Sequence, residues 1–366
     1  MDIGIVGLPR SGKTTIFNAV TRGSVDVSTF GASQGKPNMG VAKVPDDRLG
    51  VLEGMFKPKR VVPAEVTYVD IPPAPEGFGE TRGISGEFLN YLQRADALLI
   101  VARAFEDPSV PHVANSIDSI RDAETMTYEL AFADLDILEK RIKRLEAGMK
   151  SIRTSERENA NKEIALLNRL KDGLESGVSI GDQTLDQDEA RMLEGFRFLT
   201  AKPIIIAVNV GEDQISDIPM LEDRLRESFT GPRVRTAALC GKLEMELAQM
   251  EPEDELEFRS SMEAGESGLH RMIQLSYDVL DLITFLTVGA DEVRAWTIGK
   301  DTVAVKAASK IHSDIERGFI RAEVVKYEDL TRCGSLAESR KQGVLRQEGK
   351  TYMVIDGDVI NFLFNV

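Results

Sequence analysis

The first seventeen residues, MDIGIVGLPRSGKTTIF (residues 1–17), decide how the N-terminal part of this chain folds. Within them, Gly7-Leu8-Pro9-Arg10-Ser11-Gly12-Lys13-Thr14 matches the pattern G-x-x-x-x-G-K-S/T at every fixed position. The apolar stretch 3–6 predicts a short strand, and residues 15–21 are compatible with a helix. A strand, a glycine-rich loop and a helix in this order form the context in which the pattern predicts phosphate binding.

This loop is called the P-loop below (residues 7–14). The chemistry of phosphate binding explains each of its fixed residues. Gly7 and Gly12 let the backbone turn tightly, so that successive N–H groups point at phosphate oxygens. The following helix adds the partial positive charge of its N-terminus. We expect Lys13 to reach the β- and γ-phosphates and the Thr14 hydroxyl to bind Mg²⁺. The alternative is a glycine-rich turn that binds no ligand.

The composition is typical of globular domains. The chain has 366 residues, of which 42% are hydrophobic and 29% charged, and this length suggests two or three domains. No window approaches the run of about 18 apolar residues that a membrane helix needs. The net charge of −15 disfavours a surface that coats nucleic acid broadly. Acids and bases nearly balance from about residue 281 onward, so a local RNA-binding face remains open there.

The few cysteines and histidines disfavour disulfide and transition-metal chemistry. Cys240 and Cys333 lie far apart in the sequence, which argues for a reducing compartment and against a disulfide framework or a zinc site. His112, His270 and His312 lack the spacing of metal ligands. The residues therefore point away from a transition-metal enzyme.

Asp70 is the candidate for a second metal contact. It ends the β-rich run 61–69 and is followed by Ile71-Pro72-Pro73-Ala74-Pro75. An acid at the end of a strand beside a P-loop is where a further Mg²⁺ ligand is expected, often through a water molecule. The alternative is an aspartate that begins a proline-rich turn.

Strands and helices alternate along most of the chain. The apolar runs 97–102 and 204–208 are typical of buried parallel strands, and a further short strand is predicted at 234–239. Such alternation predicts a doubly wound α/β sheet. Between these strands, stretches 118–149 and 156–174 carry apolar residues at helical spacing, which predicts an antiparallel helical hairpin. Its apolar stripe is expected to form the hairpin's own seam, and binding of a partner protein is an additional hypothesis.

The loop after the strand 204–208 is the candidate for base recognition. It reads Asn209-Val210-Gly211-Glu212. In P-loop GTPases the matching strand ends in Asn-Lys-x-Asp, whose aspartate accepts hydrogen bonds from guanine. Val210 and Glu212 replace that lysine and aspartate, and the longer glutamate should disturb the geometry for guanine, whereas adenine offers its N6 amine. The alternative is an ordinary polar loop. From residue 282 a small β-rich α+β domain is predicted.

Taken together, these residues resemble the Obg-like ATPase family, usually called YchF, over nearly the whole chain. The carriers are residues 7–17, 37–41, 44–49, 105–107, 129–135, 209–212, 292–296, 311–314, 318–324 and 356–358. The resemblance implies a cytoplasmic, Mg²⁺-dependent ATPase that prefers ATP to GTP and works with the ribosome or ribosomal RNA. No membrane is expected among the partners, since no apolar run is long enough to span one.

The resemblance also implies the domain organisation. Residues 1–125 and 192–280 are expected to form a P-loop nucleotide-binding domain, residues 126–191 an inserted α-helical coiled-coil hairpin, and residues 281–366 a small β-rich α+β TGS domain. The family residues that bind nucleotide match Pro9, Arg10, Ser11, Gly12, Lys13, Thr14, Thr15, Asn209, Val210, Glu212, Leu239, Cys240 and Gly241, with Thr14 and Asp70 at the metal.

Catalysis is less well supported than binding. The family has a threonine that closes on Mg²⁺ where this chain has Gln34, and a glycine N–H donor where it has Pro73, which has no N–H. Ala74 holds the position of the water-orienting residue, so no catalytic base is evident. His112 and His312 fall in family-like runs, and structural packing is the simpler interpretation. The alternatives are a non-hydrolysing, nucleotide-sensing protein-binding scaffold and an ordinary GTPase, which Val210 and Glu212 disfavour.

Overall fold

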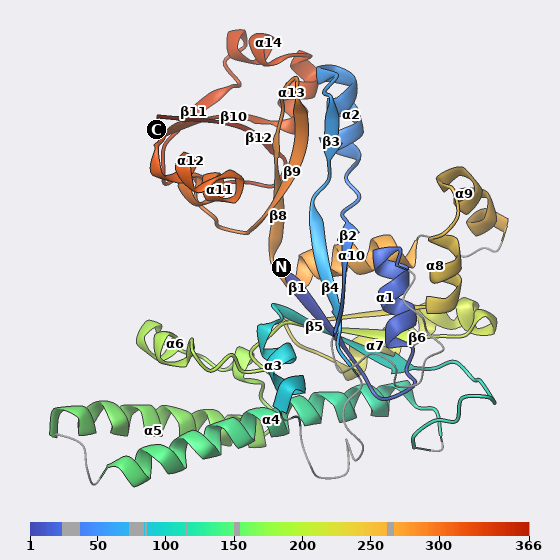
Figure 1. The fold of residues 1–366 in the computed structure, drawn as a ribbon, viewed down its shortest axis with the longest axis vertical. Coiled ribbons are helices and arrows are strands. Elements are labelled where there is room, and N and C mark those ends of the chain that lie inside the picture. Colours follow the sequence, from blue (N-terminus) through green and yellow to red (C-terminus); the bar gives the residue numbers. More distant parts are fainter. Residues whose placement is uncertain are drawn as a thin grey trace. The chain divides into compact units, whose positions relative to one another are not determined.

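The computed structural model describes residues 1–23, 37–72, 84, 86–114, 116–149, 154–261 and 267–365. The chain divides into two compact units. Unit 1 comprises Met1–Gly40 and Thr67–Leu275, and unit 2 comprises Val41–Val66 and Ser276–Val366. The described strands form two six-stranded sheets (Figure 1).

The first sheet has the strand order β2-β4-β1-β5-β6-β7. β1 pairs in parallel with β4 and β5, β5 with β6, and β6 with β7. β5 and β6 are buried over their whole length, as predicted for central parallel strands. The bounds are β1 (Asp2–Val6), β2 (Asn38–Lys43), β4 (Glu65–Asp70), β5 (Ala97–Arg103), β6 (Ile204–Asn209) and β7 (Val234–Leu239).

Helices cover both faces of this sheet. α3, α4, α7 and α8 contribute to one hydrophobic core with β1, β5 and β6. α1, which contacts α8, lies on the opposite side of the sheet from α4 (Figure 1). This confirms the predicted doubly wound α/β fold. The bounds are α1 (Lys13–Thr21), α3 (Gly86–Arg94), α4 (Ser119–Gly148), α5 (Thr154–Glu175), α6 (Gln187–Leu193), α7 (Ile218–Ser228), α8 (Gly241–Leu247), α9 (Pro252–Ser261) and α10 (Gly268–Val279), with 3-10 helices η1 (Ile180–Asp182) and η2 (Glu212–Asp217).

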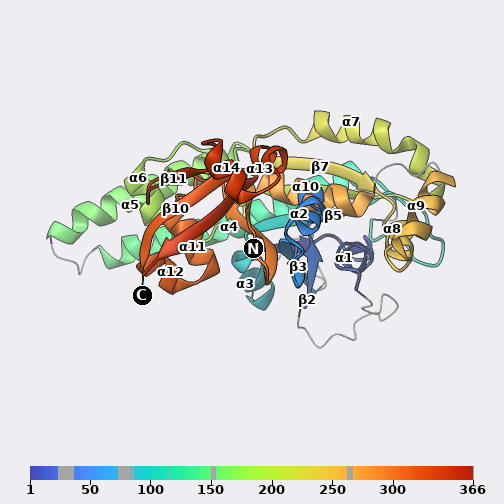
Figure 2. The ribbon, with the colours of Figure 1, turned by 90° about the horizontal axis from the view of Figure 1, so that it is seen from above.

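α4 and α5 form the predicted hairpin (Figure 2). Leu138 of α4 and Leu167 and Leu170 of α5 lie fully buried in one hydrophobic cluster. Arg141 donates to both carboxylate oxygens of Glu163, at 2.7 and 3.0 Å, and so adds a bidentate ion pair across the two helices. The apolar stripe therefore forms the seam of the hairpin itself, as its simplest interpretation predicted. Binding of a partner protein stays a hypothesis.

Asp134 fastens the base of this hairpin to the segment that leads into β6. Its carboxylate is fully buried and accepts hydrogen bonds from Leu199 N at 2.9 Å and from Thr200 N and Oγ1 at 2.7 Å each. Burial raises the pKa of Asp134 to about 6, and the three donors oppose that rise. The hairpin is thus attached to the rest of unit 1 by directed hydrogen bonds as well as by apolar packing.

The second sheet has the strand order β11-β10-β12-β8-β9-β3. It is mostly antiparallel: β10 pairs with β11 and β12, and β8 with β9. α11 packs against β9, β10 and β12 through three buried alanines. The bounds are β3 (Arg60–Val62), β8 (Leu282–Thr287), β9 (Glu292–Gly299), β10 (Phe319–Lys326), β11 (Arg346–Glu348), β12 (Asp358–Phe364), α2 (Asp47–Phe56), α11 (Ala304–Ile311), α12 (Ser313–Arg317), α13 (Tyr327–Cys333) and α14 (Leu336–Lys341).

The segment 41–66 packs differently from the sequence expectation. The expected nucleotide-binding domain, 1–125, includes it, whereas the structure groups it with unit 2. β3 pairs in parallel with β9, and Leu52 of α2 shares a hydrophobic cluster with Leu286 and Val293. This pairing joins residues more than 200 positions apart. Local residue patterns cannot reveal such a partner, since they fix only the tendency to form a strand.

Candidate functional site

The P-loop connects β1 to α1, and its two fixed glycines are required by its backbone (Figure 1). Gly12 caps α1 with a φ of 88°, in the left-handed region that favours glycine. A Cβ atom on Gly12 would lie 2.2 Å from Asn209 Nδ2, and one on Gly7 would lie 2.3 Å from the Val101 carbonyl oxygen. Both positions thus exclude a side chain, which keeps the loop backbone close to the ends of β5 and β6.

Lys13 is buried inside this loop. Lys13 is only 8% exposed. Its Nζ donates to the carbonyl oxygens of Gly7 at 3.1 Å and Leu8 at 3.4 Å. Burial lowers the pKa of Lys13 from 10.5 to about 8, and the nearby charge of Asp70 opposes that fall. Hydrogen bonds from a desolvated ammonium to anionic phosphate oxygens are stronger than its hydrogen bonds to neutral carbonyls.

We expect ATP affinity to fall as the pH rises through about 8, because Lys13 loses its charge there in the free protein. Phosphate favours the charged form, so the pKa of Lys13 is higher in the complex. Above pH 8 the protein should therefore take up close to one proton per ATP bound. Calorimetric titration in two buffers of different ionisation enthalpy measures this uptake, with a titration near neutral pH as the control. Equal proton uptake at both pH values would contradict this role of Lys13.

Thr14 and Asp70 lie together at the start of α1. Asp70 pairs with Ile5 across β4 and β1, and Thr14 Oγ1 donates to Asp70 Oδ2 at 2.9 Å. Asp70 is 6% exposed, and burial raises its pKa, against the opposing effects of Thr14 and Lys13. Hydroxyl and carboxylate oxygens are the ligand types that Mg²⁺ prefers. Among the described residues, no three or more His, Cys, Asp and Glu side chains cluster as a metal site of their own.

Asn209 joins the loops around the P-loop. It is 4% exposed, its Nδ2 donates to the Ser11 carbonyl oxygen at 3.2 Å, and its Oδ1 accepts from Gly241 N at 3.0 Å. The side chain thus ties the phosphate loop to the start of α8. The side chains of Val210 and Cys240 are buried in the core of unit 1, so any contact of these two residues with a base must come from their backbone.

Glu212, the expected reader of the base, has a partner that the sequence did not indicate. Its Oε1 lies 2.9 Å from Lys242 Nζ, with side chains 46% and 66% exposed. This contact raises the pKa of Lys242. Lys242 follows the predicted site residue Gly241 directly, which was the signal that could have found it. The ion pair bridges the loops after β6 and β7, the two loops expected to recognise the base.

The remaining predicted residues of the phosphate cradle surround Lys13. Pro9 and Thr15 are half-buried, Arg10 is exposed, and Ser11 is buried with an Oγ that has no hydrogen-bond partner among the described residues. Leu239 is buried and ends β7. The structure therefore brings together the residues of the P-loop, Asp70, Asn209 and Gly241, while Glu212 is linked to this group through Lys242.

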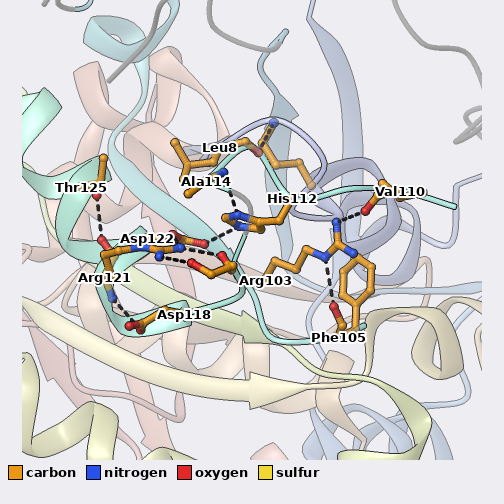
Figure 3. Close-up of polar contacts among 12 residues, drawn as sticks. Leu8, Arg103, Phe105, Val110, His112, Ala114, Asp118, Arg121, Asp122 and Thr125 are labelled. Atoms are coloured by element: carbon orange, nitrogen blue, oxygen red, sulfur yellow. Dashed lines mark hydrogen bonds and ion pairs between the residues drawn. The ribbon is translucent and has the colours of Figure 1, made fainter. Parts of the chain in front are cut away.

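Both histidines in family-like runs have structural contacts. His112 Nε2 lies 2.7 Å from Asp122 Oδ2, and its Nδ1 accepts from Ala114 N at 3.1 Å, so both ring nitrogens are engaged (Figure 3). His312 Nδ1 accepts from Asp314 N and caps α12. These contacts agree with the structural interpretation of both residues.

Gln34, Pro73 and Ala74 lie outside the described residues, so the expectations for them stay predictions. In the part of the chain that the structure describes, no helix combines the length and the apolar character needed to cross a membrane.

Comparison with known families matches both ends of the chain. A family described as 50S ribosome-binding GTPase, MMR_HSR1, matches residues 2–134. A second family, YchF-GTPase_C, described as a protein of unknown function, matches residues 282–365. The first match covers the P-loop part of unit 1 together with segment 41–66 of unit 2, and the second covers the C-terminal part of unit 2.

Related proteins match along the full length. The chain is 39% identical over 368 residues to a protein of Bacillus subtilis named "Ribosome-binding ATPase YchF", covering 100% of both chains. It is 36% identical over 363 residues to the protein of the same name from Escherichia coli O157:H7, covering 99% of each. The solved structure of the Schizosaccharomyces pombe YchF GTPase superposes with a TM-score of 0.85 at 29% identity, covering 99% of this chain and 97% of that one. This chain therefore belongs to the YchF family.

Proposed function

We propose that this protein binds ATP at the P-loop, hydrolyses it slowly and acts as a regulatory ATPase on the ribosome. The observation that carries the proposal is the built phosphate site, in which the buried ammonium of Lys13 lies within a loop whose glycines leave room for no side chain. The name "Ribosome-binding ATPase YchF" of the Bacillus subtilis and Escherichia coli relatives supports both the nucleotide and the ribosome as partners.

In this proposal each part of the site has one task. The backbone of Pro9–Thr15 and the ammonium of Lys13 hold the phosphates. The loop 209–212 and residues 239–241 recognise the base, and Thr14 with Asp70 holds Mg²⁺. The distance of 2.9 Å between Thr14 Oγ1 and Asp70 Oδ2 supports a shared metal position. A bound Mg²⁺ would neutralise negative charge on the phosphates.

The domain assignment and the location of the protein are part of the same proposal. Residues 1–125 and 192–280 serve as the nucleotide-binding domain, with segment 41–66 packed on the sheet of unit 2. Residues 126–191 serve as an inserted coiled-coil hairpin and residues 281–366 as the TGS domain. The relatives' names support a cytoplasmic protein, because ribosomes work there. The hairpin is the proposed site for other proteins.

We expect ATP to bind about tenfold more tightly than GTP, since the free energy of one good hydrogen bond corresponds to about a tenfold change in the dissociation constant. Guanine presents paired N1 and N2 donors that suit an aspartate, whereas Glu212 is one methylene longer and is already paired with Lys242. Adenine needs only an acceptor for its N6 amine. Calorimetric titration with ATP and GTP measures the ratio, and Glu212→Asp should narrow it. Equal or tighter GTP binding would refute this role of Glu212.

The competing function is a nucleotide sensor that does not hydrolyse, which Gln34 and Pro73 favour. Single-turnover assays with and without ribosomes separate the two functions. Release of phosphate that ribosomes accelerate would support the ATPase. Tight ATP binding with no phosphate release under either condition would support the sensor.

A further inference from the structure

Arg10 lies at the middle of the P-loop and is exposed. Its backbone φ is 66°, in the left-handed region that a residue with a side chain rarely adopts. From there its Nη1 donates to the carbonyl oxygen of Pro111 at 2.9 Å. A guanidinium on a long stem thus stands on the loop that cradles the phosphates, with its partner 101 residues further along the chain.

Pro111, the partner of Arg10, lies between two residues that hydrogen bonds hold in place, Val110 and His112, both labelled in Figure 3. On one side, the buried Arg103, 2% exposed, donates from Nη1 to the Val110 carbonyl oxygen at 2.8 Å. On the other side, His112 lies 2.7 Å from Asp122 and is buried. The Pro111 carbonyl is therefore a fixed acceptor that positions the guanidinium of Arg10 beside the loop.

The hydrogen bond from Arg10 to the Pro111 carbonyl is weaker than the bonds that the guanidinium could form with phosphate. The bond from Arg10 to Pro111 is exposed and has a neutral acceptor, whereas phosphate oxygens accept charge-assisted, often bidentate bonds from a guanidinium. Lys13 likewise donates to neutral carbonyls of the same loop. Both cations of the loop therefore have partners that anionic oxygens can replace, and the left-handed backbone at Arg10 is the kind of local strain that gathers at functional sites.

We propose that Arg10 is a catalytic residue for ATP hydrolysis, supplied by the P-loop itself. This inference rests on the proposed function. As the transition state of hydrolysis forms, the guanidinium exchanges the Pro111 oxygen for oxygens of the γ-phosphate and for the oxygen that bridges the β- and γ-phosphates. A water oxygen bonds to the γ-phosphorus, the bond from that phosphorus to the bridging oxygen breaks, and its electron pair stays on ADP. A proton of the water passes to the released phosphate. Arg10 stabilises the charge that grows on the bridging oxygen.

The test separates binding from chemistry. In Arg10→Ala the single-turnover rate of ATP hydrolysis should fall by about 100-fold, while the affinity for ADP changes by less than about threefold, because the interaction forms mainly in the transition state. The preference for ADP with aluminium fluoride over ADP alone should fall in parallel. Arg10→Lys should recover only part of the rate, since an ammonium lacks the fork of a guanidinium.

Arg191→Ala is the matched control, because Arg191 is an exposed arginine of α6. It should leave the rate and both affinities unchanged. An Arg10→Ala protein that binds ATP like the parent, unfolds at the same temperature and hydrolyses at the parental rate would overturn the inference. A parent that binds ATP without ever hydrolysing it would overturn it too. A parent that does not bind ATP would instead overturn the proposed function, and the role of Arg10 with it.

Discussion

Replacement of Lys13 with alanine is expected to lower ATP affinity by about 100-fold or more while the protein stays folded. In the proposed complex Lys13 donates to oxygens of the β- and γ-phosphates, and each charge-assisted hydrogen bond is worth about 1.5–3 kcal/mol. Two such bonds amount to at least about 3 kcal/mol, or more than a hundredfold in the dissociation constant.

The fold should survive this change, because Lys13 is not part of the packed core. Among the described residues, its hydrogen bonds join it to Gly7 and Leu8 in its own loop. Burial of its charge costs free energy, as its lowered pKa indicates. We expect the free energy of unfolding of the nucleotide-free variant to lie within about 1–2 kcal/mol of the parent.

Calorimetric titration and thermal unfolding measure the two effects. Lys162→Ala is a suitable control, since Lys162 is an exposed lysine of α5 that pairs with Glu158 one turn away. It should bind ATP like the parent. A Lys13→Ala protein with parental affinity and normal unfolding would show that Lys13 does not contact the phosphates.

The double variant Gln34→Thr, Pro73→Gly is expected to raise ATP turnover more than either single change. A GTPase-type switch closes through two contacts linked to the γ-phosphate, one from a threonine and one from a glycine N–H. Gln34 has no hydroxyl and Pro73 has no N–H. Each restored contact is worth about 1.5–3 kcal/mol, which corresponds to about 10- to 150-fold if it acts on the rate-limiting step. Both residues lie outside those that the structure describes, so this expectation rests on the sequence.

Turnover at saturating ATP and Mg²⁺ is measured for the parent, both single variants and the double variant. Binding of ATP to all four proteins is the control that separates closure from affinity. If the parent already turns over as fast as the double variant, the two contacts are not limiting and another group does their work.

The sequence by itself determined the features that depend on residues close together in the chain. Gly12, Lys13 and Thr14 after an apolar strand predict the P-loop because the loop's geometry is local, and the structure has β1, the loop and α1 in that order. The apolar runs of β5 and β6 predicted buried parallel strands for a similar reason: a strand covered on both faces is apolar over nearly its whole length, here up to the polar residues Arg103 and Asn209 that end the two strands. The helical spacing of α4 and α5 predicted the hairpin.

The tertiary structure alone decided which distant groups meet. Asn209 bonds to Ser11, 198 positions away, and Arg10 to Pro111, 101 positions away, while segment 41–66 joins unit 2. The sequence identifies hydrogen-bond donors, acceptors and apolar faces, but many different pairings of these groups would satisfy their hydrogen bonds and bury their apolar surface equally well. The parallel sheet of unit 1 selects among these pairings, because it brings the carboxyl ends of β1, β5 and β6 to one edge and so places their loops within hydrogen-bonding distance.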